Sequence, residues 1–416
     1  MAGIYIINIS IALLFILCSA YQLVYLAIPF LIKEKAHLTP TPHSFTILIA
    51  ARNEEAVIAQ LLDSIAAQDY PKDLIRVCVT ADNCSDSTAE IARSKGATVF
   101  ERTNKEKIGK GYVLQFMLDK LKSDGIESDV YLVLDADNVI EADYVKQMNQ
   151  SICDGFSIVT GYRNTKNYGD NWISAGYGLW FLRESQFVNR ARHRLQTSCM
   201  VMGTGFCFTH DIAKKLGGWG YFSMTEDTDF SMDMICKGEK IGYCEKAVLY
   251  DEQPVKFSQS WRQRMRWIRG SFENFTKHGK GLFSGIFKGS WSCYDALAAN
   301  LSAFIVIMVA SFANVINSIL RLVNGDSLLP VLQCIVPSVI SGYLCLFIMG
   351  AVTAISEWKN IRASSLRKLL SMFTYPFYIF TNLPIAICAL FAKAEWKPII
   401  HTRSMTLSEV KKGKKK

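Results

Sequence analysis

Two groups of carboxylates have the spacing of a reactive site. The stretch "LVLDADN" ends an apolar run with Asp135 and Asp137, and the alternation of side chains along a strand puts both on one side. Two carboxylates so placed repel each other unless a cation joins them, and Mg²⁺ or Mn²⁺ would also take diphosphate oxygens. The stretch "SMTEDTDFSMD" adds Glu226 and Asp227, either of which could serve as a general base. A helix cap for the first pair, and helix-dipole complementation for the second, are the plainer alternatives.

A third group is the cationic and aromatic stretch "SQSWRQRMRW". Helical spacing places Gln263, Arg266 and Trp267 on one face. Arginine suits bidentate phosphate contacts, and tryptophan offers a flat face for a sugar ring. A basic helix at a membrane surface would have the same composition. Nucleic acid is not an expected partner, because the chain has no known nucleic-acid-binding motif and the domain is not strongly basic.

Polar loops follow other strand-like runs. "AARNEE" carries Arg52, Asn53 and Glu54, which could bind the base and ribose edges of a nucleotide or simply cap a helix. Asp82 stands where the next strand ends and could accept a hydrogen bond from a uracil N–H. "KIGKGYVL" places Lys110 between glycines, but it lacks the full phosphate-loop pattern, and no G-x-G-x-x-G follows a strand. P-loop ATPase and NAD dehydrogenase activities are therefore poor hypotheses.

The elements that must position these residues alternate between strand and helix patterns. Strands are expected at 45–50, 74–80, 97–101 and 129–137, and helices at 54–68, 87–96 and 111–122. This β-α-β-α order predicts an α/β domain with a mostly parallel, doubly wound sheet. Ligands of such sheets bind beyond the carboxyl ends of the strands, where the polar loops described above fall.

Apolar runs flank this domain. Hydrophobic residues make up 50% of the 416-residue chain and the mean hydropathy is +0.15. Three runs, 4–32, 296–320 and 328–355, exceed the roughly 20 residues that cross a bilayer. A further run, 373–391, is interrupted by Pro376 and Pro384. "KNIRASSLRKLLSM" is basic and amphipathic and should lie on the membrane surface, as should "GLFSGIFKGSWSCYD".

Charge and cysteine usage indicate the side of the membrane. Lys33 and Lys35 follow the first run and place that end in the cytosol by the positive-inside rule. The net charge of +9 is modest and suits a protein that lies against an anionic leaflet. The twelve cysteines include no C-x-x-C pair and are expected to be reduced. Four full spans would place the Lys-rich C-terminus outside. Either one run is not a simple span, which we expect of the Pro-interrupted run, or the tail departs from the positive-inside rule.

Together these stretches resemble glycosyltransferase family 2, in particular its membrane-embedded synthases of cellulose, chitin, hyaluronan and poly-N-acetylglucosamine. The family pattern is a strand-end Asp, then D-x-D, T-E-D and Q-x-x-R-W, in that order. Here these are Asp82, "DAD" at 135–137, "TED" at 225–227 and "QRMRW" at 263–267. The resemblance implies a cytosolic GT-A domain, Rossmann-like, between an N-terminal transmembrane helix and C-terminal transmembrane and interfacial helices. The expected boundaries are 1–35, 36–278, 279–400 and a basic tail at 401–416.

The resemblance also implies roles for the matching residues. Asp82 and Asp135 would contact the uridine diphosphate part of a UDP-sugar, and Asp137, with Asp135, would hold Mg²⁺ or Mn²⁺. Asp227, beside Glu226, would deprotonate the acceptor hydroxyl. Arg266 would steady the departing diphosphate and Trp267 would border the acceptor sugar. The remaining expected site residues are Arg52, Asn53, Glu54, Lys110 and Gln263 on the donor side, and Gly203, Thr204 and Gly205 of "GTGFCF" on the acceptor side.

These implications leave competing functions. The favoured hypothesis is a metal-dependent, inverting hexosyltransferase that extends a β-linked polysaccharide from UDP-N-acetylglucosamine or UDP-glucose and couples this to export. The alternative is single transfer to a membrane lipid. A catalytically silent scaffold is a third hypothesis, which the intact acidic and Arg/Trp sets disfavour. In either enzymatic case we expect a multi-pass protein of the plasma membrane with its catalytic domain in the cytosol.

Overall fold

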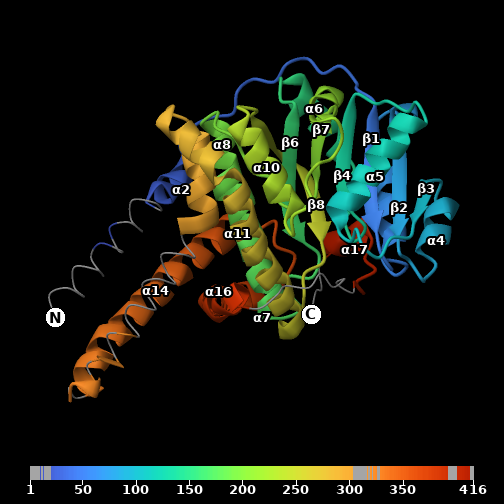
Figure 1. Cartoon of the computed structure of the whole chain (residues 1–416). Helices are drawn as coiled ribbons and strands as arrows, with labels where there is room; N and C mark the ends of the chain where they lie inside the picture. The colour runs from blue at the N-terminus through green and yellow to red at the C-terminus, as the bar shows by residue number, and fades with distance from the viewer. Residues whose placement is uncertain are drawn as a thin grey trace.

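The computed structural model describes residues 20–302, 328–391 and 401–412, together with a few single positions before residue 20 and between 316 and 325. The strands between Phe45 and Asp251 belong to an α/β domain from which the C-terminal helices project (Figure 1). Much of the expected spans 4–32 and 296–320 lies outside the described residues. The end of the expected span 4–32 is described and forms the helix α2 (Tyr21–Leu31).

The first half of the domain follows the expected alternation closely. Its elements are β1 (Phe45–Ala51), α3 (Ile58–Ala66), η1 (Lys72–Leu74), β2 (Ile75–Asp82), α4 (Thr88–Ser94), β3 (Thr98–Arg102), α5 (Lys110–Ser123) and β4 (Val130–Asp135). The second half contains β5 (Val139–Ile140), α6 (Tyr144–Cys153), β6 (Ile158–Thr165), α7 (Trp172–Arg183), η2 (Glu184–Asn189), α8 (Arg190–Arg194), β7 (Phe206–Thr209), α9 (His210–Leu216), α10 (Glu226–Cys236) and β8 (Ile241–Asp251).

All eight strands form one sheet in the order β3-β2-β1-β4-β7-β6-β8-β5. The expected parallel arrangement is correct for β3, β2, β1 and β4, and for the pair β6 and β8. It is wrong elsewhere, because β7 runs antiparallel to β4 and β6, and β5 runs antiparallel to β8. After β6 the chain passes through α7, η2 and α8 and comes back to the edge of the sheet at which β6 ended. β7 starts from that edge, and it therefore runs antiparallel to β6.

Two apolar layers sandwich this sheet. On β1, Ile47 and Ile49 pack toward α3, α4 and α6, whereas Leu48 packs toward α5, α7 and α10. This alternation along one buried strand is the pattern that a sheet covered on both faces requires. The carboxyl ends of β1, β2 and β4 are thereby held at one edge, where the polar loops emerge.

A long helix connects the domain to the C-terminal helices. α11 (Phe257–Phe287) has 31 residues and is followed by α12 (Trp291–Leu297) and η3 (Ala298–Ser302). The buried Arg264 donates from Nη1 to the carbonyl oxygen of Tyr378 at 3.0 Å and to Oγ1 of Thr381 at 2.7 Å. The expected amphipathic segment after residue 280 thus includes the end of α11 and the start of α12.

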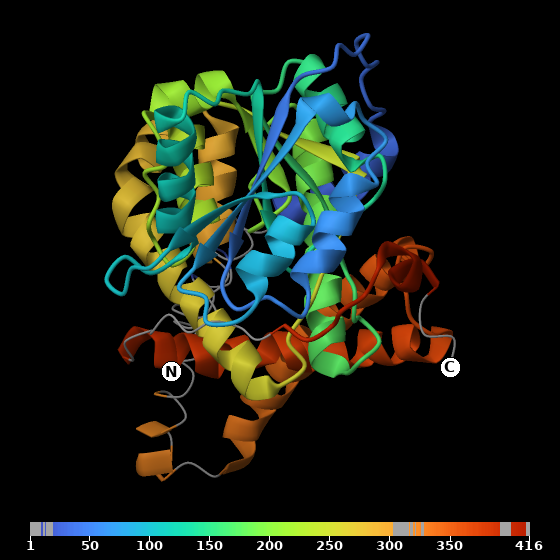
Figure 2. The ribbon, with the colours of Figure 1, turned by 90° about the vertical axis from the view of Figure 1, so that its right-hand side faces the viewer.

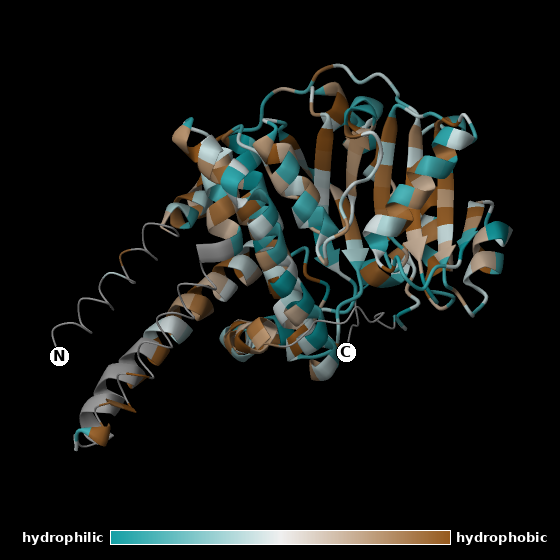
Figure 3. Ribbon diagram, in the orientation of Figure 1, coloured by the Kyte–Doolittle hydropathy of each residue, from teal (hydrophilic) through white to brown (hydrophobic). Residues whose placement is uncertain are grey.

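The C-terminal helices are α14 (Leu328–Ser356), α15 (Ser365–Phe380) and α16 (Asn382–Phe391). α14 projects away from the domain, whereas α15 and α16 run across its base (Figure 2). Two described stretches, Val339–Ser356 and Ser365–Phe391, are long and apolar enough to cross a bilayer. Many of their apolar side chains are exposed, and Figure 3 shows α14 as largely hydrophobic where it is coloured. α15 continues through Pro376 without a break.

The last described segment returns to the domain. Residues 401–412 end in α17 (Leu407–Lys412), and Lys411 pairs with Glu141 beside β5. The backbone N–H groups of Thr402 and Arg403 donate to the carboxylate of Glu252 at 2.9–3.2 Å. Residues 401–412 therefore lie against the same sheet edge that carries the polar loops.

Candidate active site

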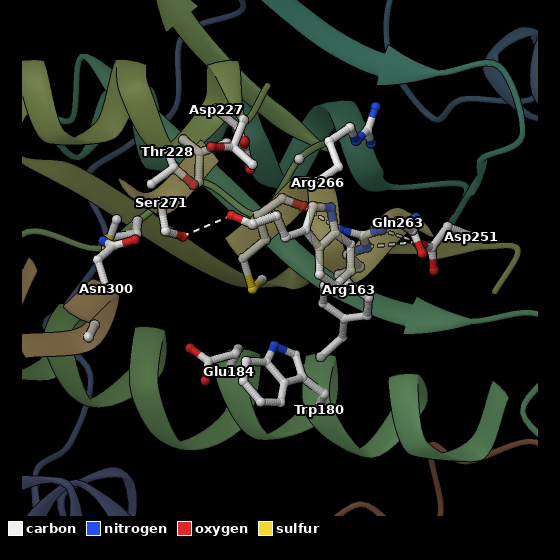
Figure 4. Close-up of a pocket in the computed structure, with 18 of the residues that line it drawn as sticks. Arg163, Trp180, Glu184, Asp227, Thr228, Asp251, Gln263, Arg266, Ser271 and Asn300 are labelled. Carbon is white, nitrogen blue, oxygen red and sulfur yellow. Dashed lines mark hydrogen bonds and ion pairs between the residues drawn. The ribbon is translucent and has the colours of Figure 1, made fainter. Parts of the chain in front are cut away.

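A single cavity of 1610 Å³ collects most of the predicted site residues at the carboxyl edge of the sheet. Small-molecule sites are typically about 300–1,000 Å³, so this cavity has room for two ligands. The predicted residues that line it are Arg52, Glu54, Asp82, Lys110, Asp135, Asp137, Gly203, Glu226, Asp227, Gln263, Arg266 and Trp267. Figure 4 shows part of this cavity, with Asp227, Arg266 and Gln263 along one side.

Lys110 is the cation at the centre of the sheet edge. It opens α5, and its ammonium contacts Oδ1 of Asp135 and donates to the carbonyl oxygen of Gly203 at 2.8 Å. Burial alone would lower its pKa, but the carboxylates of Asp135 and Glu226 raise it above the ordinary value. The acidic groups around Lys110 thus favour its charged form beside the D-x-D pair.

The D-x-D loop is held rigidly. The hydroxyl of Thr204 accepts from the backbone N–H of Asp135 at 2.9 Å and donates to Oδ1 of Asn138 at 2.6 Å. The carboxylate of Asp137 accepts from the N–H of Glu252 at 2.9 Å, and buried Lys166 contacts the Asp137 carbonyl oxygen. These contacts hold the backbone of the D-x-D loop, and the N–H of Glu252 orients the carboxylate of Asp137.

These two carboxylates have the chemistry of a divalent-cation site. Carboxylate oxygens are the ligands that Mg²⁺ and Mn²⁺ prefer, with substrate phosphates completing the coordination. Within the described part of the chain, no group of three His, Cys, Asp or Glu side chains is arranged to hold a metal ion. The donor set of Asp135 and Asp137 suits a metal whose coordination is completed by diphosphate oxygens.

The C-terminal segment supplies a residue that the sequence did not single out. His401 lines the cavity, with Nδ1 2.9 Å from Oε2 of Glu54 and Nε2 4.0 Å from Oδ2 of Asp137. Burial alone would lower the pKa of His401, but these carboxylates raise it to about 10. His401 lies 347 residues from Glu54, so no local pattern could have joined them.

The T-E-D stretch begins α10 at the cavity wall. Asn274 of α11 donates from Nδ2 to the carbonyl oxygen of Thr225 at 3.2 Å and to its Oγ1 at 2.9 Å. A Cβ on Gly270 would lie 2.4 Å from that same Oγ1, so α11 packs directly on this residue. The contacts of α11 thus fix where Glu226 and Asp227 begin the helix.

Both carboxylates of this stretch have raised pKa values. Burial, and then the charge of Asp227, raise the pKa of Glu226 to about 7. Burial also raises the pKa of Asp227, although the neighbouring cations Lys110 and Arg163 oppose the shift. A carboxylate with a raised pKa is a stronger base, which is what proton abstraction from a hydroxyl requires.

The Q-x-x-R-W residues face the cavity from α11, as the helical spacing predicted. Among the described residues, Oε1 of Gln263 and Nε of Arg266 are buried without a hydrogen-bond partner. Buried polar groups are normally paired, so these atoms indicate a ligand that the cavity receives. Trp267 packs edge-on against the rings of Tyr177 and Phe181, with ring centroids 5.7 Å and 6.1 Å apart, and these contacts orient the indole ring.

Three predicted residues do not line the cavity. Asn53 has a left-handed backbone (φ 56°), and its side chain accepts from the N–H of Ser85 at 2.8 Å, so it shapes the loop. Thr204 is buried in the contacts with the D-x-D loop, and a Cβ on Gly205 would meet Leu249 at 1.8 Å. The structure therefore places these three residues in loops beside the cavity, and their expected contact with ligands stays a prediction.

Sequence reasoning missed Arg163 and Arg102. Arg163 of β6 donates from Nε to Asp251 at 2.7 Å, and its guanidinium lies over the ring of Phe181 at 3.7 Å (Figure 4). It also donates to the carbonyl oxygen of Met202, beside the predicted acceptor loop. Arg102 pairs with Asp82 inside the domain. Each lies within a strand, where an isolated arginine gives no motif.

The opposite end of the cavity is apolar. Leu23 and Leu26 of α2, Leu346 and Met349 of α14, and Leu383 of α16 line it. Exposed apolar residues of α14 and α15, including Val339 and Phe380, also contribute, so this end meets the surface that a bilayer would cover. The cavity thus joins an ionic end to an apolar end.

Comparison with known proteins identifies the domain. The family model described as "Glycosyltransferase like family 2" matches residues 42–270, more than half of the chain. A probable glycosyltransferase, YdaM, of Bacillus subtilis is 28% identical over 232 residues, 54% of each chain. The β-monoglucosyldiacylglycerol synthase of Synechocystis is 24% identical over 59% of this chain and 51% of its own length. The poly-β-1,6-N-acetyl-D-glucosamine synthase of Staphylococcus epidermidis is 25% identical over 62% of this chain and 64% of its own.

The fold has a full-length counterpart among solved structures. The mannosyltransferase PcManGT of Pyrobaculum calidifontis, solved with GDP-Man and Mn²⁺, superposes with a TM-score of 0.57. That superposition covers 92% of this chain and 99% of the other, at 16% sequence identity, and so establishes a likeness of fold. The matches to the curated relatives, in contrast, span about half to two thirds of their lengths.

Proposed function

Because the chain belongs to the glycosyltransferase family 2-like proteins, we propose that it transfers a hexose from a UDP-sugar to a hydroxyl group of a membrane lipid. The observation that carries this proposal is the continuity of one cavity from the ionic sheet edge to the apolar helices α2, α14 and α16. A lipid acceptor has both characters, a polar head for the catalytic end and tails for the apolar end.

The reaction we propose is a single displacement at the anomeric carbon. Asp227 takes the proton of the acceptor hydroxyl, the oxygen forms its bond to the anomeric carbon, and the bond from that carbon to the diphosphate breaks. Lys110 and Arg266 stabilise the negative charge that collects on the departing UDP. A divalent metal held by Asp135 and Asp137 would supply further neutralisation of that diphosphate when bound.

The donor end is proposed to hold the nucleotide. Asp82 stands at the end of β2 and Glu54 and Arg52 at the end of β1, where ligands of open α/β sheets bind. UDP-glucose and UDP-N-acetylglucosamine are the donors to test first. The names of the Synechocystis and Staphylococcus relatives refer to products built from these two sugars.

Polysaccharide synthesis is the second candidate. It is favoured by the intact "QRMRW" stretch and by the likeness to the poly-β-1,6-N-acetyl-D-glucosamine synthase over 62% of the chain. In either case we propose a multi-pass protein of the plasma membrane whose catalytic domain faces the cytosol. The exposed apolar surfaces of α14 and α15 support that placement.

Product analysis separates the two candidates. The full chain in lipid nanodiscs would be given Mg²⁺ or Mn²⁺, one UDP-sugar and a diacylglycerol, and UDP release would be followed together with product size. A lipid that carries one added hexose supports the proposal. A ladder or high polymer, without a lipid product, would overturn it in favour of the polysaccharide synthase.

A further inference from the structure

A second cluster of polar side chains, which belong to none of the sequence motifs described above, also lines the cavity. Ser271 and Thr228 lie beside Asp227, and Glu184 and Asn300 approach from other helices (Figure 4). Ser271 is four residues beyond Trp267 on α11, and its hydroxyl donates to the Trp267 carbonyl oxygen at 3.0 Å. It therefore stands one helical turn, about 5.4 Å, past the predicted acceptor-binding tryptophan.

Unusual backbone presents two members of this cluster. Glu184 begins the π-helical turn η2, and Asn300 lies in the π-helical turn η3. π-helical turns make up well under 1% of residues in globular proteins and are frequent at functional sites. In the described part of the chain these are the two π-helical turns, and both line this cavity.

The cluster offers hydrogen bonds without unbalanced positive charge. Arg183 pairs with Glu184 and also donates to Oε1 of Gln22 at 2.6 Å. Arg192, the other arginine of this wall, makes two hydrogen bonds to the carboxylate of Asp295, at 2.8 and 2.9 Å. A phosphate would therefore find two arginines whose positive charges are already balanced by Glu184 and Asp295.

Resting on the lipid-acceptor function proposed above, we propose that Glu184, Asn300 and Ser271 form the subsite for the acceptor headgroup, and that it selects a neutral, hydroxyl-rich headgroup such as glycerol or a sugar over a phosphate. The Glu184 carboxylate accepts from hydroxyls, and the Asn300 amide accepts through its oxygen and donates through the N–H that is not bonded to the Ala296 carbonyl. The Ser271 oxygen can accept, since its own proton goes to the Trp267 carbonyl. Trp180, which lines the cavity beside Glu184, adds an aromatic face.

The test compares acceptors with the same tails and different headgroups. Wild type, Glu184→Gln and Asn300→Leu, each as the full chain in nanodiscs, would be assayed with diacylglycerol, glucosyl diacylglycerol and phosphatidic acid. Ser271→Ala tests the hydroxyl on α11, and the exposed Ser284→Ala on the same helix is its matched control. UDP binding by calorimetry reports whether each variant retains its donor site.

We expect wild type to prefer the neutral acceptors. Asn300→Leu and Ser271→Ala should each raise the acceptor KM, by about tenfold for Asn300→Leu, because a polar group of the headgroup loses its partner. Glu184→Gln should reduce the preference for the neutral acceptors over phosphatidic acid at least tenfold. UDP affinity should not change in these variants, and Ser284→Ala should match wild type throughout.

Two results would overturn the inference, and they differ. If the lipid product forms but the three variants keep the wild-type acceptor KM and headgroup preference, the subsite is wrong and the lipid-acceptor function stands. If wild type makes polymer and no lipid product, the proposed function fails and the subsite fails with it. Because Glu184 and Asn300 lie on different helices, misfolding of one variant, seen as lost UDP binding, leaves the other to decide.

Discussion

At the scale of single residues, the candidate site is defined by charged side chains that are buried. Asp227 and Glu226 open α10 inside the cavity, with Lys110 among the cations that face them. Gln263 and Arg266 present buried polar atoms without partners among the described residues. These features follow from residue types that the sequence displays, and they make the reactive groups individually testable.

Replacing Asp227 by Asn removes the proposed base while keeping its shape. We expect kcat to fall by about 10²- to 10⁴-fold, the usual contribution of general base catalysis. UDP affinity should stay close to that of wild type, because Asp227 is assigned to the acceptor. The measurements are steady-state UDP release and calorimetric UDP titration, with the exposed Asp211→Asn as control. Near-normal turnover in Asp227→Asn would show that another group is the base.

The raised pKa of Asp227 predicts the direction of the pH dependence. A base works only when it is deprotonated, so activity is present above its pKa and is lost as the pH falls through it. Because burial raises this pKa, the acid limb of kcat/KM should lie above the ordinary aspartate value of about 3.9. A pH profile of kcat/KM, with UDP affinity measured at the same pH values, tests this. A profile that stays flat down to about pH 4 would contradict it.

At the scale of elements, α11 organises the site. One face of it carries Gln263, Arg266 and Trp267 into the cavity, and a later turn holds Thr225 through Asn274. Arg264 of the same helix donates to the carbonyl oxygen of Tyr378 in α15 and to Oγ1 of Thr381, which lies between α15 and α16. A single helix therefore ties the leaving-group cation, the base and the membrane-side helices together.

A methyl group on Gly270 should disturb this arrangement. Its Cβ would lie 2.4 Å from Oγ1 of Thr225, so either α11 or the start of α10 must shift. We expect Gly270→Ala to lower kcat at least tenfold, since Asp227 follows two residues after Thr225. Gly279→Ala on the same helix is the control, because its Cβ meets only the ring of Phe275, at 3.3 Å. Equal activity of the two variants would show that α11 does not position the proposed base Asp227.

A buried ion pair joins α2, α8 and α12. The carboxylate of Asp295 binds Arg192 and accepts from the hydroxyls of Tyr21 at 2.7 Å and Tyr25 at 2.8 Å. Asp295→Asn would leave a buried guanidinium without its counter-charge and should cost about 3–5 kcal/mol of stability. The exposed pair of Asp63 with Lys95 offers the control, since Asp63→Asn should cost at most about 1 kcal/mol. Denaturant unfolding in detergent measures both, and similar losses would contradict the role of the buried pair.

At the scale of the whole molecule, a globular domain sits on an exposed apolar base. α14 projects from the domain, and α15 and α16 run beneath it with much apolar surface uncovered (Figure 2). Contiguous exposed apolar patches of this kind mark membrane or protein contacts. Residues of α14, α15 and α16 also line the cavity, so the proposed lipid acceptor would reach the proposed catalytic groups without leaving a membrane.

Membrane insertion predicts how the protein fractionates. We expect it to stay in the membrane pellet after washes with high salt and with alkaline carbonate, and to be released by detergent. Charge-based attachment would be reversed by salt, whereas buried apolar helices would not. Immunoblots of the fractions measure this, with a known peripheral protein as control. Release by carbonate alone would mean that the apolar base is covered by another protein.

From the sequence alone we could predict the proposed catalytic set and most of the elements that carry it. The strand-end acids, "TED" and "QRMRW" could be read because each depends on neighbours a few residues apart, which the periods of strand and helix decide. The same local logic predicted β1 to β4 with α3 to α5 to within a few residues. Asn53, Thr204 and Gly205 were assigned to ligands because a pattern does not distinguish a residue that lines a cavity from one that shapes its loop.

The features that join distant parts of the chain depend on tertiary packing. The antiparallel direction of β7 depends on where the excursion through α7 and α8 returns. The approach of His401 to Glu54 crosses 347 residues, and the contact of Arg163 with Asp251 crosses 88. The apolar end of the cavity and the polar cluster around Glu184 likewise arise from helices that meet only after packing. Such contacts are set by the burial of whole faces, and no local spacing encodes them.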